Sequence, residues 1–144
     1  MDSNVLIAGL ASNKGASALV LKLIEAQAVK AQISKQIVKE TERNIKKKLP
    51  EFLSYFYYAL NYLPLTISTD SKNIDKRLSK YFPKKSDQMI FETVQKLKPD
   101  YFLTLNRKHF HQTAFKKIAH FKIRTPAQFL DEWKEIKMSD LDTK

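Results

Sequence analysis

Four polar side chains that are far apart in the sequence could together perform metal-ion chemistry. They are Asp2, Glu40, Asp87 and Asn106. Carboxylates that are held together repel one another, so either one of them stays protonated or a cation lies between them. A ligand set of oxygen atoms suits Mg²⁺ or Mn²⁺, and such an ion can activate water for hydrolysis of a phosphodiester bond. These residue types therefore predict a metal-dependent phosphodiesterase site, provided that the fold brings them together.

Each of the three acids also has a plain structural interpretation. Asp87 could cap a helix, Asp2 could be a terminal charge, and Glu40 could pair with a nearby lysine or arginine. The residues alone leave both interpretations open, because convergence depends on the fold.

The segments that must position these residues alternate between extended and helical patterns. Strands are predicted at residues 29–33, 63–68, 101–105 and 121–124. Helices are predicted at residues 17–24, 34–49 and 52–60, from 69 or 70 to 78, at 86–98 and 108–118, and from 126 onward. Ser17 and Ser34 could cap the first two of these helices. The second carries Ile37, Val38, Thr41 and Ile45 on one side until Pro50 stops it. This alternation predicts an α/β fold, a three-layer α/β/α sandwich with a mostly parallel central sheet. Sites in such sheets form at the carboxyl ends of strands, where the four residues could meet.

The charge of the chain is strongly positive and unevenly distributed. The net charge is +11, and residues 3–130 carry 23 Lys and Arg against 9 Asp and Glu. A basic body favours a polyanionic partner such as nucleic acid, although plain solubility explains it as well. Lys84 and Lys85 precede Asp87, and Arg107 and Lys108 follow Asn106, so these four are the candidates for gripping RNA phosphates. The run 46–48 is more typical of a solvated helix end.

Composition limits the class of protein further. The chain of 144 residues has the length of one domain, here expected at 1–137, with a polar C-terminal tail at 138–144. It contains no cysteine, which excludes disulfides, zinc ribbons and thiol catalysis. No apolar run reaches the roughly 20 residues that span a bilayer, and no secretory signal is visible. We therefore expect a cytoplasmic protein with no membrane partner.

Six short segments resemble, in order, the motifs of the PIN-domain family. They are residues 2–7, 8–15, 33–40, 86–91, 101–106 and 125–130. Each motif is loose, but the six together span nearly the whole chain. The resemblance implies that Asp2, Glu40 and Asp87 are the metal-binding acids, and that Asn106 completes the pocket. It also implies a Mg²⁺- or Mn²⁺-dependent endoribonuclease, often the VapC-like toxin of a toxin–antitoxin pair. RNA, an antitoxin protein and a second copy of the chain are then the expected partners.

Three departures from the family pattern support an alternative. Members normally have a strand before the opening Asp, whereas only Met1 precedes Asp2, so the first strand is expected to be missing or truncated. Asn106 stands where an acid is common, and it brings no charge to a metal. His109 stands where another Asp is common. These departures leave open a weak or inactive PIN-like module that binds RNA or protein.

The aromatic run 55–58 lies within a predicted helix. Four consecutive helix positions point in different directions, so at least one ring must face outward. The run could stack on unpaired bases, but core packing and a protein interface explain it better.

Overall fold

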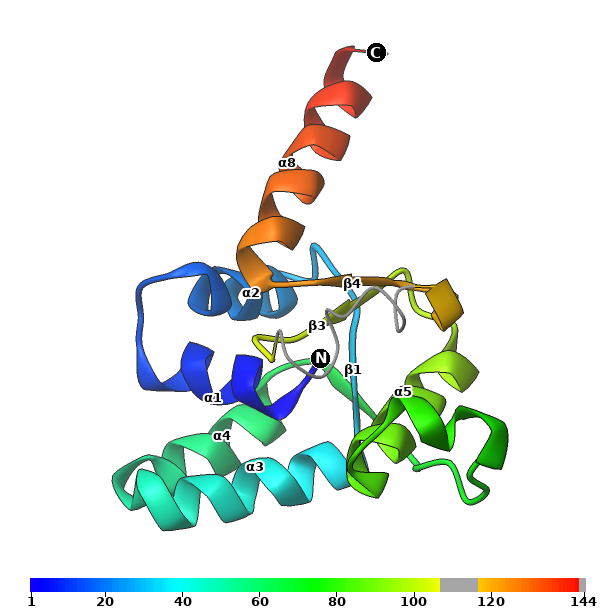
Figure 1. Cartoon of the computed structure of the whole chain (residues 1–144). Coiled ribbons are helices and arrows are strands. Elements are labelled where there is room, and N and C mark those ends of the chain that lie inside the picture. The colour runs from blue at the N-terminus through cyan, green and yellow to red at the C-terminus, as the bar shows by residue number, and fades with distance from the viewer. Residues whose placement is uncertain (107–116, 143–144) are drawn as a thin grey trace.

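The computed structural model describes residues 1–106 and 117–142. Helices and short strands alternate along the chain, as Figure 1 shows. The helices are α1 (Ser3–Ala11), α2 (Ala16–Glu25), α3 (Lys35–Lys48), α4 (Leu53–Tyr62), α5 (Lys85–Leu97) and α8 (Pro126–Asp142), with 3-10 helices η1 (Pro50–Phe52) and η2 (Lys76–Tyr81). The strands are β1 (Ala31–Ser34), β2 (Leu65–Ser68), β3 (Tyr101–Leu103) and β4 (Lys122–Arg124). This confirms a small α/β fold.

The strands form two parallel pairs rather than one wide sheet. β1 pairs with β2, with Ala31 opposite Leu65, and β3 pairs with β4, with Tyr101 opposite Lys122. The N-terminal segment connects the pairs, because the Met1 amino group donates to Gln32 O at 3.2 Å and Asp2 N donates to Leu103 O at 2.9 Å. Met1 and Asp2 therefore hydrogen bond to β1 on one side and to β3 on the other, and each sheet is smaller than the one predicted.

Helix α3 shows how local sequence determines an element that carries a site residue. The Ser34 hydroxyl accepts a hydrogen bond from Ile37 N at 3.2 Å and caps the first turn. Ile37, Thr41 and Ile45 recur on one side and are buried. The helix ends at Lys48, two residues before Pro50, which cannot continue it. The capping residue, the apolar stripe and the stop were all predicted from the sequence.

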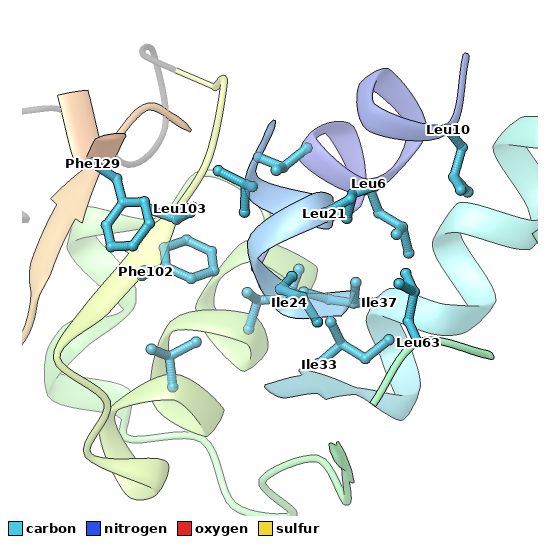
Figure 2. Packing of buried hydrophobic residues seen from close by; sticks show 14 of the residues in the cluster. Leu6, Leu10, Leu21, Ile24, Ile33, Ile37, Leu63, Phe102, Leu103 and Phe129 are labelled. Carbon is cyan, nitrogen blue, oxygen red and sulfur yellow. The ribbon is translucent and has the colours of Figure 1, made fainter. Parts of the chain in front are cut away.

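One part of the core lies where α1 crosses α2 and packs against α3, and it is continuous with buried side chains of α5, β3, β4 and α8. Figure 2 shows Leu6, Leu21 and Ile24 packed towards Ile33 and Ile37. The crossing favours a glycine, because a Cβ at Gly9 would lie 2.5 Å from Leu21 Cδ1 and 3.0 Å from the backbone oxygen of Ser17, so Leu21 would have to move. Each fully buried aliphatic side chain of this kind contributes about 1.5–3 kcal/mol to folding. The close crossing of α1 and α2 holds the N-terminus of α1, and with it Asp2, against the core.

Some predicted boundaries were wrong for identifiable reasons. The helix expected from residue 69 or 70 does not begin there, and only the 3-10 helix η2 follows, from residue 76. Instead, the two oxygens of the Asp70 carboxylate share one hydrogen bond from Gln36 N, at 3.1 and 3.2 Å, at the start of α3. Gly15, not Ser17, is the N-cap of α2, with φ at 95°. Residues 138–142, expected in a polar tail, are helical and continue α8. In the first of these cases, Asp70 satisfies a backbone N–H at the N-terminus of α3 rather than capping a helix of its own.

The outer surface carries the aromatic run predicted from the sequence. Phe56 is fully buried, whereas Tyr55, Tyr57 and Tyr58 are 52%, 41% and 60% exposed. Helix geometry predicted at least one ring that faces outward, and three of the four rings do.

Within the described residues, no single helix is long and apolar enough to cross a membrane. Helices α1 and α2 reach the required length and composition only as a pair bent by 93°.

Candidate metal site

Asp2 is the N-cap of α1, and its own backbone N–H donates the hydrogen bond to Leu103 O in β3. It is 4% exposed, so its carboxylate is almost out of contact with water. Its Oδ1 accepts a hydrogen bond from Ser3 N at 2.8 Å, and its Oδ2 accepts one from the Thr104 hydroxyl at 2.7 Å. Thr104 is fully buried and comes just after β3. The first predicted ligand is therefore held in one orientation by groups from two elements.

Glu40 comes to the same place from α3. It is half-buried, lies one turn after Gln36, and receives a side-chain hydrogen bond from Ser3. Ser3 thus contacts both acids, giving its backbone N–H to Asp2 and its hydroxyl to Glu40. Because a serine hydroxyl is small and can rotate, it can donate to Glu40 while its own N–H is engaged. The N-terminus of α1 positions two acids with one residue.

Asp87 completes the acidic cluster, defined here as Asp2, Glu40 and Asp87. It lies in the first turn of α5, where the partial positive charge of the helix N-terminus favours a carboxylate. A hydrogen bond of 3.2 Å from Gln36 Nε2 to Ser86 O connects this turn to the start of α3. Asp87 repels the charges of both Asp2 and Glu40. The three acids predicted from the sequence are therefore brought within electrostatic reach of one another.

Burial and mutual repulsion change the acidity of two of these groups. Desolvation raises the pKa of Asp2 above its usual value, while the hydrogen bond from Thr104 opposes the rise and Asp87 adds to it. Desolvation is also the main cause of the raised pKa of Glu40, and Asp2 is the next. In both cases the charged form is disfavoured. Such a cluster gains stability when a proton or a cation is bound.

Asn106, the fourth predicted residue, is connected to Asp2 through Thr104. Its backbone N–H donates to the Thr104 hydroxyl at 3.0 Å, and that hydroxyl donates to Asp2. Asn4 makes a second connection, since Leu105 N donates to Asn4 Oδ1 at 3.1 Å and Asn4 Nδ2 donates to Asp2 Oδ2 at 3.4 Å. The segment after β3 is thus tied to the first acid at two points, which places Asn106 at the border of the cluster.

The basic residues predicted to grip RNA are only partly within the described structure. Lys84 is the N-cap of α5 and Lys85 its first residue; both are exposed, two to three positions before Asp87. Arg107, Lys108 and His109, together with most of the helix predicted at 108–118, lie outside the described residues. Lys84 and Lys85 lie in the same helix turn region as Asp87, so they stay candidates for binding phosphate.

The donor set and electrostatics of the cluster fit a divalent cation. All three side chains offer carboxylate oxygens, the ligands preferred by Mg²⁺ and Mn²⁺, and their repulsion is the kind that such an ion relieves. In the part of the chain that the structure describes, no three acidic or histidine side chains stand close enough to hold one ion as they are placed. The cluster thus has the donor atoms and the charge for a divalent ion but not, as placed, the spacing of a shared site.

A small α/β fold with acids near its strand ends defines a class of proteins in which a divalent ion can be held at the edge of the sheet. The family model of the PIN domain matches residues 1–108, three quarters of the chain. The chain therefore belongs to the PIN-domain family, whose members are generally metal-dependent nucleases. Comparison with curated proteins and with solved structures gave no match.

Sequence reasoning missed the residues that orient the acids. Ser3, Asn4 and Thr104 all lie inside the motifs, yet their roles were not predicted. A polar residue within two positions of a predicted ligand was the available signal, since ligand carboxylates need hydrogen-bonding partners. Which acid each one contacts depends on packing between α1, α3 and β3, and the sequence gives no sign of that.

Proposed function

We propose that this protein is an endoribonuclease that hydrolyses RNA phosphodiester bonds with Mg²⁺ or Mn²⁺ held by Asp2, Glu40 and Asp87. The observation that carries the proposal is the electrostatic coupling of these three acids in a chain of the PIN-domain family. The positive charge outside the cluster supports a polyanionic substrate.

Some side chains would bind the ion, and others would orient the side chains that bind it. When bound, the ion would make water a better nucleophile and neutralise charge that develops on the phosphate. Asp2 would offer its carboxylate in the orientation fixed by Thr104, and Glu40 would do so under the hydrogen bond from Ser3. Asn106 would help to position the ion or water through its amide oxygen, and Lys84 and Lys85 would contact the phosphate backbone.

A cleavage assay combined with direct measurement of Mn²⁺ binding tests this proposal. Asp87→Asn removes one ligand charge with little change in shape, and Asp131→Asn, an exposed acid on α8, is the matched control. We expect Asp87→Asn and EDTA to abolish cleavage, and Asp87→Asn to weaken Mn²⁺ binding by at least about 100-fold, because a direct ligand matters more than an outer-shell partner. Cleavage in EDTA, or cleavage unchanged by Asp87→Asn, would refute it.

The alternative function, a weak or inactive module that binds RNA or protein, also has an observation in its favour. The carboxylates stand too far apart to share an ion as they are placed, and Asn106 supplies no charge. RNA binding without turnover at saturating Mn²⁺ would favour this alternative over the nuclease.

We also propose that the protein is the cytoplasmic toxin of a toxin–antitoxin pair. This rests on the family and on the basic charge of the chain. Expression of the protein alone should arrest growth, and coexpression of the product of an adjacent open reading frame should relieve the arrest. Growth arrest that persists in the Asp87→Asn variant would separate toxicity from the proposed nuclease.

A further inference from the structure

The exposed side of α3 is a second feature of the molecule, distinct from the acidic cluster. Its side chains recur at i, i+3, i+4, i+7 and i+8, the spacing of a single helix face, and they line a shallow hollow. We call this surface the basic face; it consists of Lys39, Glu42, Arg43, Lys46 and Lys47. The opposite side of the helix is buried in the core, so the basic face is presented to solvent as one rigid row.

The basic face keeps most of its positive charge uncompensated. Glu42 forms an ion pair with Lys46, at 2.9 Å between Oε1 and Nζ. Among the described residues, no carboxylate lies within 4.0 Å of the charged groups of Lys39, Arg43 or Lys47. Three cations in a row repel one another, and a polyanion that lies along the row relieves the repulsion.

The row begins beside the acidic cluster. Lys39 immediately precedes Glu40, and the positive charge of Arg43, one turn further, acts on the Glu40 carboxylate. From Lys39 to Lys47 the helix rises about 12 Å away from that point. A bound strand could therefore run from the cluster along the basic face without a break.

An aromatic side chain lies at the border of the row. Tyr57, from α4, is 41% exposed and hydrogen bonds to Glu42. Helices α3 and α4 pack against each other, so this ring stands beside the row of cations. Single-stranded nucleic acid is commonly bound by cations along the backbone combined with a ring on which a base can stack.

We propose that the basic face binds the phosphate backbone of single-stranded RNA and leads it towards the acidic cluster, an inference that rests on the proposed function. An acidic protein is the less suitable partner, because protein interfaces need a buried apolar centre. The basic face offers only charged side chains and one tyrosine at its border. Interfaces with nucleic acid, in contrast, are polar and strongly positive.

Binding of a fluorescein-labelled, unstructured RNA in EDTA tests the proposal without cleavage. The test variant is the triple Lys39→Gln, Arg43→Gln, Lys47→Gln. The control is the triple Lys30→Gln, Lys96→Gln, Lys134→Gln, which removes three exposed charges from other parts of the molecule. Anisotropy is measured from about 50 to 200 mM salt, the range over which counterion release dominates.

We expect the test variant to bind at least about tenfold more weakly at low salt. Its slope of log K against log salt should fall by about 2, since each phosphate contact contributes roughly 0.7 for a single strand. The control should lose less than about threefold and keep its slope, because distant charges act only through a screened field. Equal losses in both triples, no binding by the wild type, or equal displacement by poly-glutamate and unlabelled RNA would overturn the proposal.

Two further measurements distinguish this inference from the proposed function. Mn²⁺ affinity should be unchanged in the test variant, because none of its substitutions removes a carboxylate. If the basic face binds RNA as expected but the wild type cuts no RNA with any divalent ion, the nuclease fails and the RNA surface stands. If RNA is cut but the two triples bind it alike, the nuclease stands and this surface fails.

Discussion

The acidic cluster and the basic face share one helix, yet charge behaves differently in the two. Glu40 and Lys39 are neighbours in α3, but Glu40 is half-buried and Lys39 is exposed. Burial raises the pKa of Glu40 and of Asp2, whereas the Glu42–Lys46 pair on the exposed side is surrounded by water. Two residues that are neighbours in sequence can therefore differ in the strength of their electrostatic interactions, because burial strengthens these interactions and water weakens them.

The two regions should also respond differently to substitution. A buried acid held by several hydrogen bonds acts as part of a unit, so its removal changes metal binding steeply. An exposed cation acts together with others through a field that salt screens, so single changes are small and accumulate. Substitutions in the acidic cluster should therefore have large effects, and substitutions on the basic face should have small ones.

Asp2→Asn should weaken metal binding strongly without lowering the stability of the fold. The amide keeps acceptor capacity at the N-cap of α1 but removes one of three mutually repelling charges. We expect Mn²⁺ affinity, measured by electron paramagnetic resonance, to fall at least about 100-fold. The thermal midpoint of the metal-free protein should stay the same or rise, as measured by calorimetry. A large fall in that midpoint would mean that the Asp2 charge serves the fold.

Thr104→Val should weaken metal binding by about tenfold, the lower end for loss of an outer-shell hydrogen bond. Valine keeps the shape of threonine but removes the donor to Asp2 Oδ2. Thr104→Ser should restore affinity. Thr93→Val is the control, because its buried hydroxyl bonds to Met89 O and Ser71 N, not to an acid of the cluster. Equal loss of Mn²⁺ affinity in both valine variants would remove the positioning role of Thr104.

Stability of the metal-free protein should depend on pH in a defined direction. The pKa values of Asp2 and Glu40 are raised above the ordinary values of 3.8 and 4.5. The folded state therefore binds protons more tightly than the unfolded state between those ordinary values and the raised ones. The contribution of these groups is most favourable below pH 3.8 and is lost as pH rises through the raised values. Saturating Mn²⁺ should cancel this loss, which thermal melts at stepped pH can measure.

Glu42→Gln should have the smallest effect on folding. Exposed ion pairs often contribute nothing measurable to stability, so the thermal midpoint should move by less than about 1 °C. The same change frees Lys46 and should raise affinity for single-stranded RNA by roughly twofold at low salt. A decrease in RNA affinity would show that Glu42 orders the basic face instead of weakening it.

Much of the fold followed from local patterns. The cap at Ser34, the buried stripe of α3 and the stop before Pro50 appeared as predicted, because each depends on residues within a few positions. The helix expected from residue 69 or 70 did not form, because Asp70 instead binds the backbone at Gln36, 34 positions earlier in the chain. A partner so distant in sequence leaves no local pattern to read.

In the candidate site too, some features depend on local sequence and others on contacts between distant segments. The chemical types at the cluster are local information, because the carboxylates of Asp2, Glu40 and Asp87 can be read directly from the chain. Their mutual repulsion, their orientation by Ser3 and Thr104, and the row of cations on α3 beside them are properties of the folded molecule. Desolvation and charge coupling depend on distance and burial, which arise only when α1, α3, α5 and β3 pack together.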